Sequence, residues 1–119
     1  MVLARYSIKQ HRWWLVLVVC AGLGGCSFGL GRPSLTSPDP ALKIPAMKQA
    51  AASRNTHAIP ALLAALSSHD PAVRFYANNA LEAITGRHFG YVYYASRADR
   101  RKAIDRWCQW YAHAKRGFH

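Results

Sequence analysis

Apolar side chains recur at the spacing of an amphipathic helix in three stretches of the chain. Within each stretch they stand three or four residues apart, which places them on one face of a helix. The pattern predicts one helix over about residues 57–67, a second that ends at Gly86, and a third that begins after Ser96. The positions that form these faces are Ile59, Leu62, Leu63 and Leu66, then Val73, Ala77, Ala80, Leu81 and Ile84, and finally Ile104, Trp107, Cys108 and Tyr111.

Residues with known roles at helix ends mark where the helices begin. Asp-Pro occurs at residues 39–40 and 70–71, where Asp can accept hydrogen bonds from free backbone N–H groups and Pro gives up no needed donor. The five residues from each Asp-Pro match in type at a spacing of 31, which is typical of stacked helix pairs. We therefore expect an earlier helix over about residues 44–53, with Pro45 delaying its start or bending it. Thr56 is the expected cap of the next helix.

An aromatic segment, residues 87–94, separates the second and third predicted helices. Gly90 makes a continuous helix unfavourable there, so we expect a loop that folds back under Trp107 and Trp110. Asp99 stands three residues after Ser96 and completes a capping box for the last helix. On that helix Cys108 shares the apolar face, which predicts a buried and inert thiol.

The N-terminal sequence has the order of features of an export signal. Residues 1–12 carry three basic side chains and no acidic one, and residues 13–25 carry no charge. This apolar run is shorter than the ~20 residues of a membrane-spanning helix and suits a signal peptide. Its end, Leu23-Gly24-Gly25-Cys26, resembles the bacterial lipobox, which implies cleavage before Cys26 and acylation of Cys26. An uncleaved signal anchor, or a secretory signal cut elsewhere, is the alternative.

We therefore expect a lipoprotein signal peptide over residues 1–25, and a mature chain held in the membrane and facing the periplasm or the cell exterior. Ser27 follows Cys26, and this resembles lipoproteins that are sent to the outer membrane. If the envelope has two membranes, the outer membrane is therefore favoured. Residues 26–40, rich in Gly, Pro and Ser, are expected to be the lipidated cysteine and a flexible tether. Residues 41–119 are long enough for one helical domain with a modest core.

Basic side chains dominate the mature chain and gather near its C-terminus. Loss of residues 1–25 removes three of the 16 Lys and Arg and none of the five Asp and Glu, so the net charge falls only from +11 to +8. Export would separate this chain from nucleic acid, which leaves anionic lipid head groups, envelope polymers or an acidic protein surface as partners. A basic helix that is merely solvated is the alternative. The candidate binding residues are Arg97, Arg100, Arg101, Lys102 and Arg106, with Tyr91, Tyr93 and Tyr94 beside them.

The central sequence resembles a HEAT repeat. Residues 58–86 contain a first helix with the pattern Ile-Pro-x-Leu-Leu-x-x-Leu, an Asp-Pro turn, and a second helix that opens Val-Arg. Trp107 and Trp110 resemble the Trp-x-x-Trp helix that closes the stack in small bacterial HEAT-repeat proteins. The resemblance covers roughly residues 40–113. It implies an all-α fold, a short α-solenoid of HEAT-like helix pairs closed by an aromatic C-terminal helix, and a protein-binding or scaffolding role. It also implies that Arg74 ties one repeat to the next.

The sequence offers little for catalysis or metal binding. Of its five acidic residues, Asp39 and Asp70 are expected to cap helices, and Asp99 and Asp105 are expected to pair with Arg neighbours on a basic helix. The histidines show no pairing four residues apart and no Cys at ligand spacing. No nucleophile elbow, phosphate loop or dinucleotide fingerprint occurs. We therefore expect no enzyme, no metal and no cofactor.

Two functions fit these features. The favoured one is a membrane-anchored lipoprotein whose helical domain binds another envelope protein through hydrophobic faces, with the basic helix giving orientation. The alternative is an electrostatic binder of anionic envelope material, either lipid head groups or polymers, through the basic C-terminal helix. Salt separates the two, since screening weakens the second far more than the first.

Overall fold

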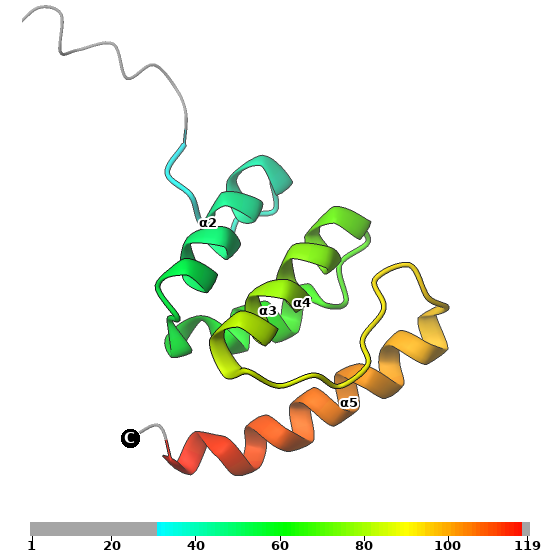
Figure 1. Ribbon diagram of the computed structural model, residues 1–119. Helices are drawn as coiled ribbons and strands as arrows, with labels where there is room; N and C mark the ends of the chain where they lie inside the picture. The colour runs from blue at the N-terminus through cyan, green and yellow to red at the C-terminus, as the bar shows by residue number, and fades with distance from the viewer. Residues whose placement is uncertain (1–30, 118–119) are drawn as a thin grey trace, which may run out of the picture. The chain divides into compact units, whose positions relative to one another are not determined.

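The computed structural model describes residues 31–117, and over this range the chain is helical with no strand. The predicted signal peptide, Cys26 and Ser27 lie outside the described residues. None of the described helices is both long and apolar enough to cross a membrane. The helical elements, shown in Figure 1, are α2 (Pro40–Ala52), η1 (Thr56–Ala58), α3 (Ile59–Ala65), α4 (Pro71–Thr85), α5 (Arg97–Ala114) and η2 (Lys115–Gly117).

The two Asp-Pro pairs begin helices, as their sequence predicts. Asp39 Oδ1 accepts a hydrogen bond from the Ala41 N–H at 2.9 Å, and Asp70 Oδ1 accepts one from the Ala72 N–H at 2.7 Å. Each Pro occupies the first helical position, where its missing N–H leaves no carbonyl unpaired. At the other end of α4, Gly86 has a φ of 67°, the left-handed conformation that commonly ends a helix.

Helix α2 begins earlier than the predicted residue 44 and continues past Pro45. Pro45 has no N–H, so the Ala41 carbonyl lacks its usual helical hydrogen bond. Ala41 is exposed, and its carbonyl can bind water instead. The chain before α2 also belongs to the folded unit, which spans Arg32–His119. The Ser34 N–H donates to the Leu42 carbonyl at 3.1 Å, and Leu35 packs against the core. The last part of the expected tether is therefore folded.

The start of the next helix differs from its prediction. Asn55, rather than Thr56, is the cap: its side-chain oxygen accepts from the His57 N–H at 3.0 Å. A short 3₁₀ turn, η1, precedes α3, and the Ile59 N–H donates to the Thr56 carbonyl. Pro60 has no N–H to donate to that carbonyl, so the tighter 3₁₀ bond from Ile59 takes its place.

Helix α4 lies at the centre of the fold, with α2 and α3 packed against it. Figure 1 shows α5 crossing below these helices and the segment between α4 and α5 running alongside it. The predicted apolar faces of α3 and α4 meet in one core, with Leu62, Leu66 and Leu81 fully buried. The largest side chains with almost no exposure are Trp107, Met47, Ile59, Leu62, Leu66, Leu81 and Val73.

Arg74 is a buried cross-link between two parts of the chain. Its Nη1 donates to the carbonyls of Ser68 at 2.8 Å and His69 at 3.0 Å, in the turn before α4. Its Nε donates to the Tyr93 carbonyl at 3.0 Å, in the segment that follows α4. A buried guanidinium stabilises a fold only when its donors are paired, and here three bonds to backbone hold both connections to one helix.

The N-terminus of α5 has the predicted cap, but the buried face of the helix is rotated. Ser96 Oγ accepts from the Asp99 N–H at 3.1 Å and donates to the Asp99 carboxylate at 2.7 Å. Ala103 and Trp107 are buried, whereas Cys108 is exposed, which contradicts its expected place in the core. Successive helical residues point about 100° apart, and the aromatic segment packs on the Trp107 side, so Cys108 faces outward.

Candidate functional site

The aromatic segment folds back on α5 as predicted. The Phe89 ring lies edge-to-face with Trp107 at a centroid distance of 4.6 Å, and 6.2 Å from Trp110. Tyr91 is only 7% exposed, and its hydroxyl donates to the Leu66 carbonyl at 2.6 Å. Burial raises the pKa of Tyr91, and the nearby charges of two arginines oppose this shift. Tyr91 therefore belongs to the core and offers no side chain to a binding surface.

Two of the five candidate basic residues also have structural roles. Arg100 donates to the Ala95 carbonyl and Arg106 to the Phe89 carbonyl, each at 2.6 Å. The Arg106 bond joins α5 to the aromatic segment, in which Gly90 adopts a φ of 71° close to the Arg106 guanidinium, and the Arg100 bond joins α5 to the residue that follows this segment. These two arginines hold the segment in place and are not free for a ligand in this arrangement.

The other three candidate basic side chains are exposed on the first half of α5. Lys102 pairs with Asp99 at 3.6 Å, so the partner of this carboxylate is a lysine and not the arginine that the sequence suggested. The Ser96 hydrogen bond, followed by the charge of Lys102, holds the pKa of Asp99 below its usual range. The side chains of Arg97 and Arg101 form no hydrogen bond or ion pair with any other described residue.

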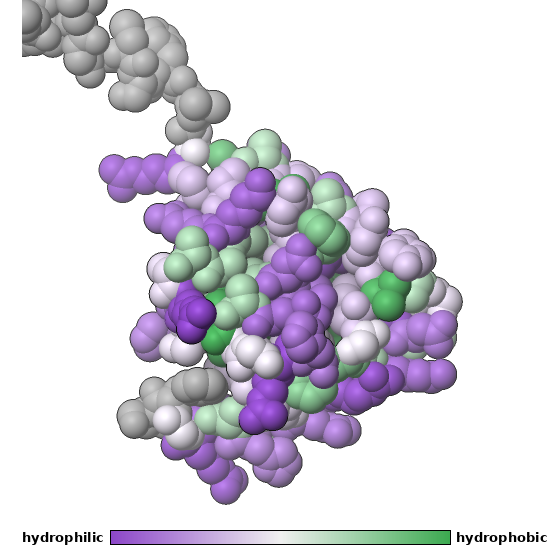
Figure 2. Space-filling view, in the orientation of Figure 1, coloured by the Kyte–Doolittle hydropathy of each residue, from purple (hydrophilic) through white to green (hydrophobic). Residues whose placement is uncertain are grey.

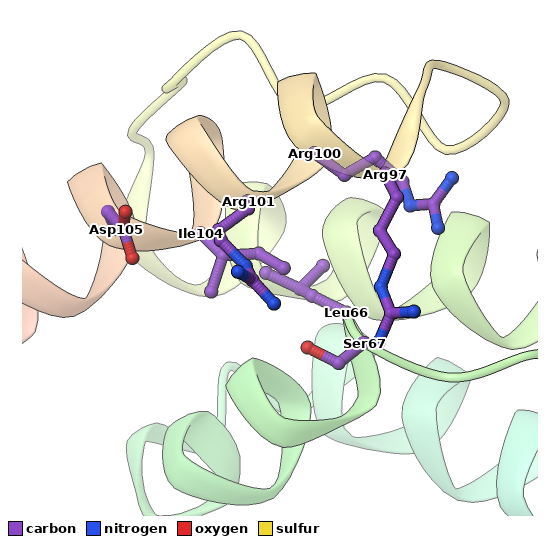
Figure 3. Close-up of a pocket in the computed structure, with 7 residues that line it drawn as sticks. All are labelled: Leu66, Ser67, Arg97, Arg100, Arg101, Ile104 and Asp105. Atoms are coloured by element: carbon purple, nitrogen blue, oxygen red, sulfur yellow. The ribbon is translucent and has the colours of Figure 1, made fainter.

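Arg97 and Arg101 line a cavity of about 220 Å³ between α5 and the residues that follow α3. Figure 3 shows both side chains reaching from α5 toward Leu66 and Ser67, whereas Arg100 points away toward its carbonyl partner. The complete lining is Leu66, Ser67, Arg97, Arg100, Arg101, Ile104 and Asp105. We call this hollow the basic cavity.

A second surface feature is a row of four aromatic rings. Phe75 lies 5.2 Å from both Tyr76 and Tyr93, and Tyr93 lies 5.0 Å from Tyr94, all in edge-to-face contacts. Lys48 is placed 4.8 Å above the Tyr76 ring. We call these four rings the aromatic row. It joins α4 to the aromatic segment, so residues distant in sequence form one surface.

The aromatic row lies in the most apolar exposed part of the described surface. Tyr94 is 77% exposed, and Phe75 and Val92 are each 38% exposed. Figure 2 shows mostly pale or hydrophilic colour on this face of the molecule, with small separate hydrophobic spots. The sequence analysis did not select Phe75 or Val92. Phe75 could have been identified from the sequence, because it is a large apolar residue that lies outside the predicted buried face of α4.

A groove of about 300 Å³ adjoins the aromatic row and contains an unpaired polar atom. Asn78 lines this groove and donates its amide N–H to Glu82 at 3.1 Å. The side-chain oxygen of Asn78 is buried and has no hydrogen-bond donor among the described residues. His88 Nδ1 lies 3.0 Å from the same Glu82 oxygen. A buried acceptor without a donor costs about 1–3 kcal/mol, and because this oxygen is closed off from solvent, the cost belongs to the fold and not to a binding surface.

The described residues offer no arrangement suited to catalysis by a metal ion. No three His, Cys, Asp or Glu side chains in residues 31–117 lie close enough together to hold one. No protein-family model matches the chain, and comparisons with curated proteins and with solved structures found no significant similarity.

Proposed function

We propose that this chain is a bacterial membrane lipoprotein, anchored through acylated Cys26, whose domain binds another envelope protein without catalysing a reaction. The lipobox-like sequence supports the anchor, and a second acyl chain would make membrane attachment stable. We also propose that α2–α4 form a short HEAT-like solenoid closed by α5. The Asp-Pro helix starts and the linking role of Arg74 support this arrangement.

The aromatic row is the observation that carries the protein-binding proposal. Residues that dominate protein interfaces are enriched in Tyr and Trp and cluster at well-packed centres. Tyr94 presents most of its ring to solvent, and edge-to-face contact with Tyr93 limits the freedom that it would lose on binding. Affinity at this surface would come from ring burial more than from charge.

A cross-linking experiment tests this surface in the cell envelope. A photoreactive phenylalanine replaces Tyr94 in one variant and Gln109, an exposed residue of α5, in the control. We expect one discrete cross-linked protein from position 94 and none from position 109. A second substitution, Phe75→Ala, should remove the cross-link, and raised salt should not. Equal cross-linking from both positions would contradict a specific aromatic interface.

The basic cavity favours a second candidate function, electrostatic binding of anionic envelope material. Arg97 and Arg101 present charges that no described residue neutralises. Attraction of such exposed charges to an anionic surface weakens as salt rises, because the screening length is only ~8 Å at physiological ionic strength. Binding to anionic vesicles that disappears at physiological salt, together with no cross-link at position 94, would favour this candidate over protein binding.

A further inference from the structure

The side chains of the basic cavity separate positive from negative charge along α5. Arg97, Arg101 and Asp105 follow one another at intervals of four residues, and all three line the cavity. Each interval advances about 6 Å along a helix. Figure 3 shows Asp105 at the opposite end of this series from Arg97. A ligand in the cavity therefore meets two positive charges toward the start of the helix and one negative charge further along.

These charges are available to a ligand in the described structure. Arg97, Arg101 and Asp105 are exposed, and none of their side chains forms an ion pair or a hydrogen bond with another described residue. The hydroxyl of Ser67, on the facing wall, points into the gap in Figure 3. Arg100 shapes the cavity but is held by the Ala95 carbonyl.

The cavity also has apolar side chains beside its charged groups. Leu66 is fully buried behind the opening and Ile104 is half-buried, so part of the lining is apolar. Charge-assisted hydrogen bonds gain strength where water is excluded. A guanidinium matches the oxygens of a phosphate group in a two-pronged arrangement, and a carboxylate accepts hydrogen bonds from an ammonium group.

We propose that the basic cavity binds a phosphate ester of ethanolamine. Arg97, Arg101 and the Ser67 hydroxyl hold the phosphate, and Asp105 accepts from the ammonium group. A simple polyanion fits less well, because its far end would face the Asp105 carboxylate. The cavity volume of about 220 Å³ suits a small head group. The source of the ester is the head group of phosphatidylethanolamine, and this part alone rests on the membrane anchoring proposed above.

Soluble head-group esters test the site without requiring a membrane. The full chain, in non-ionic detergent micelles, is titrated with glycerophosphoethanolamine, glycerophosphocholine and inorganic phosphate, and the arginine side-chain N–H signals are followed by NMR. We expect glycerophosphoethanolamine to bind about tenfold more tightly than glycerophosphocholine, whose methylated nitrogen has no N–H for Asp105. Equal binding of the two esters would overturn the proposal.

Matched variants separate this site from general attraction to a basic protein. Arg101→Gln and Lys115→Gln each remove one exposed positive charge, but Lys115 does not line the cavity. We expect Arg101→Gln to weaken glycerophosphoethanolamine binding about tenfold and Lys115→Gln to leave it unchanged. Asp105→Asn should remove the preference over glycerophosphocholine without weakening binding of inorganic phosphate. Equal losses in Arg101→Gln and Lys115→Gln, or an unchanged preference in Asp105→Asn, would overturn the site.

An experiment in nanodiscs identifies the source of the ester. The full chain is placed in nanodiscs of phosphatidylcholine with or without phosphatidylethanolamine, and the same Arg97 and Arg101 signals are recorded. We expect phosphatidylethanolamine to reproduce the shifts caused by the soluble ester, and Asp105→Asn to abolish the difference between nanodiscs with and without phosphatidylethanolamine. Shifts with the soluble ester but not with the lipid would refute the lipid as source and assign the site to free esters.

Discussion

Replacement of Trp107 by alanine tests whether α5 closes the core. The Trp107 side chain is 0% exposed, and its ring contacts Phe89 at 4.6 Å and Trp110 at 5.8 Å. Truncation of a buried Trp to Ala typically costs about 3–5 kcal/mol. Small domains are stable by only about 5–15 kcal/mol in total. We therefore expect Trp107→Ala to leave the domain close to unfolding at room temperature.

The Trp107→Phe variant supplies a matched control for this effect. The Trp107 indole N–H is buried without an acceptor among the described residues, which costs about 1–3 kcal/mol. Phenylalanine keeps most of the packing and removes that donor, so we expect a loss much smaller than that of the alanine variant. Urea unfolding of the chain from Arg32 onward, followed by circular dichroism, gives both values. A loss below about 1 kcal/mol in Trp107→Ala would refute the closing role of α5.

Four other changes have definite expected outcomes. Leu81→Ala should lower the free energy of unfolding by about 2–5 kcal/mol. A loss under about 1 kcal/mol in urea titration would show that the apolar face of α4 does not pack in a common core. Tyr91→Phe should cost about 1 kcal/mol through its lost hydrogen bond, and an unchanged urea midpoint would contradict that bond. Because the folded-state pKa of Asp99 is lowered, the stability that ionised Asp99 gives the fold is present above the ordinary pKa of about 3.9 and is lost as pH falls below it. Ser96→Ala should therefore lower the melting temperature at pH 7 and make the melting temperature fall less steeply below pH ~4. Cys26→Ala should abolish incorporation of a fatty-acid probe, and label retained in this variant would contradict the lipobox.

Helix ends were predictable because their chemistry is local. Asp39, Asp70 and Ser96 each cap the helix that their immediate sequence indicates, and Gly86 ends α4. In these cases the donor, the acceptor and the required backbone conformation lie within a few residues. The exception is the cap before α3, where the loss of a donor at Pro60 favours a 3₁₀ turn and moves the cap back by one residue, to Asn55.

The direction in which α5 faces was not predictable from spacing alone. Helical periodicity groups Ile104, Trp107, Cys108 and Tyr111 on one side, but it does not fix which edge of that side is buried. The edge is decided by the aromatic segment, which packs Phe89 against Trp107 and leaves Cys108 in solvent. Such a contact depends on tertiary structure, so the sequence pattern of the helix does not contain it.

The candidate site was predictable only as a region, because equivalent arginines have different partners. Arg97, Arg100 and Arg106 are indistinguishable by residue type and lie on one helix. In the structure Arg100 and Arg106 donate to backbone carbonyls between α4 and α5, whereas the Arg97 side chain lines the basic cavity without such a bond. Whether a guanidinium is available thus depends on where another segment places its carbonyl groups.

The aromatic segment links the stability of the fold to its surface. Its side chains alternate in exposure: Phe89, Tyr91 and Tyr93 are buried or half-buried, whereas Val92 and Tyr94 are exposed. Alternation of this kind is the pattern of extended chain, in which successive side chains point to opposite sides. One short segment therefore closes the core with one set of side chains and presents a surface with the other. A change to an inward-facing residue would disturb both roles, so only variants of the outward-facing residues measure binding separately from folding.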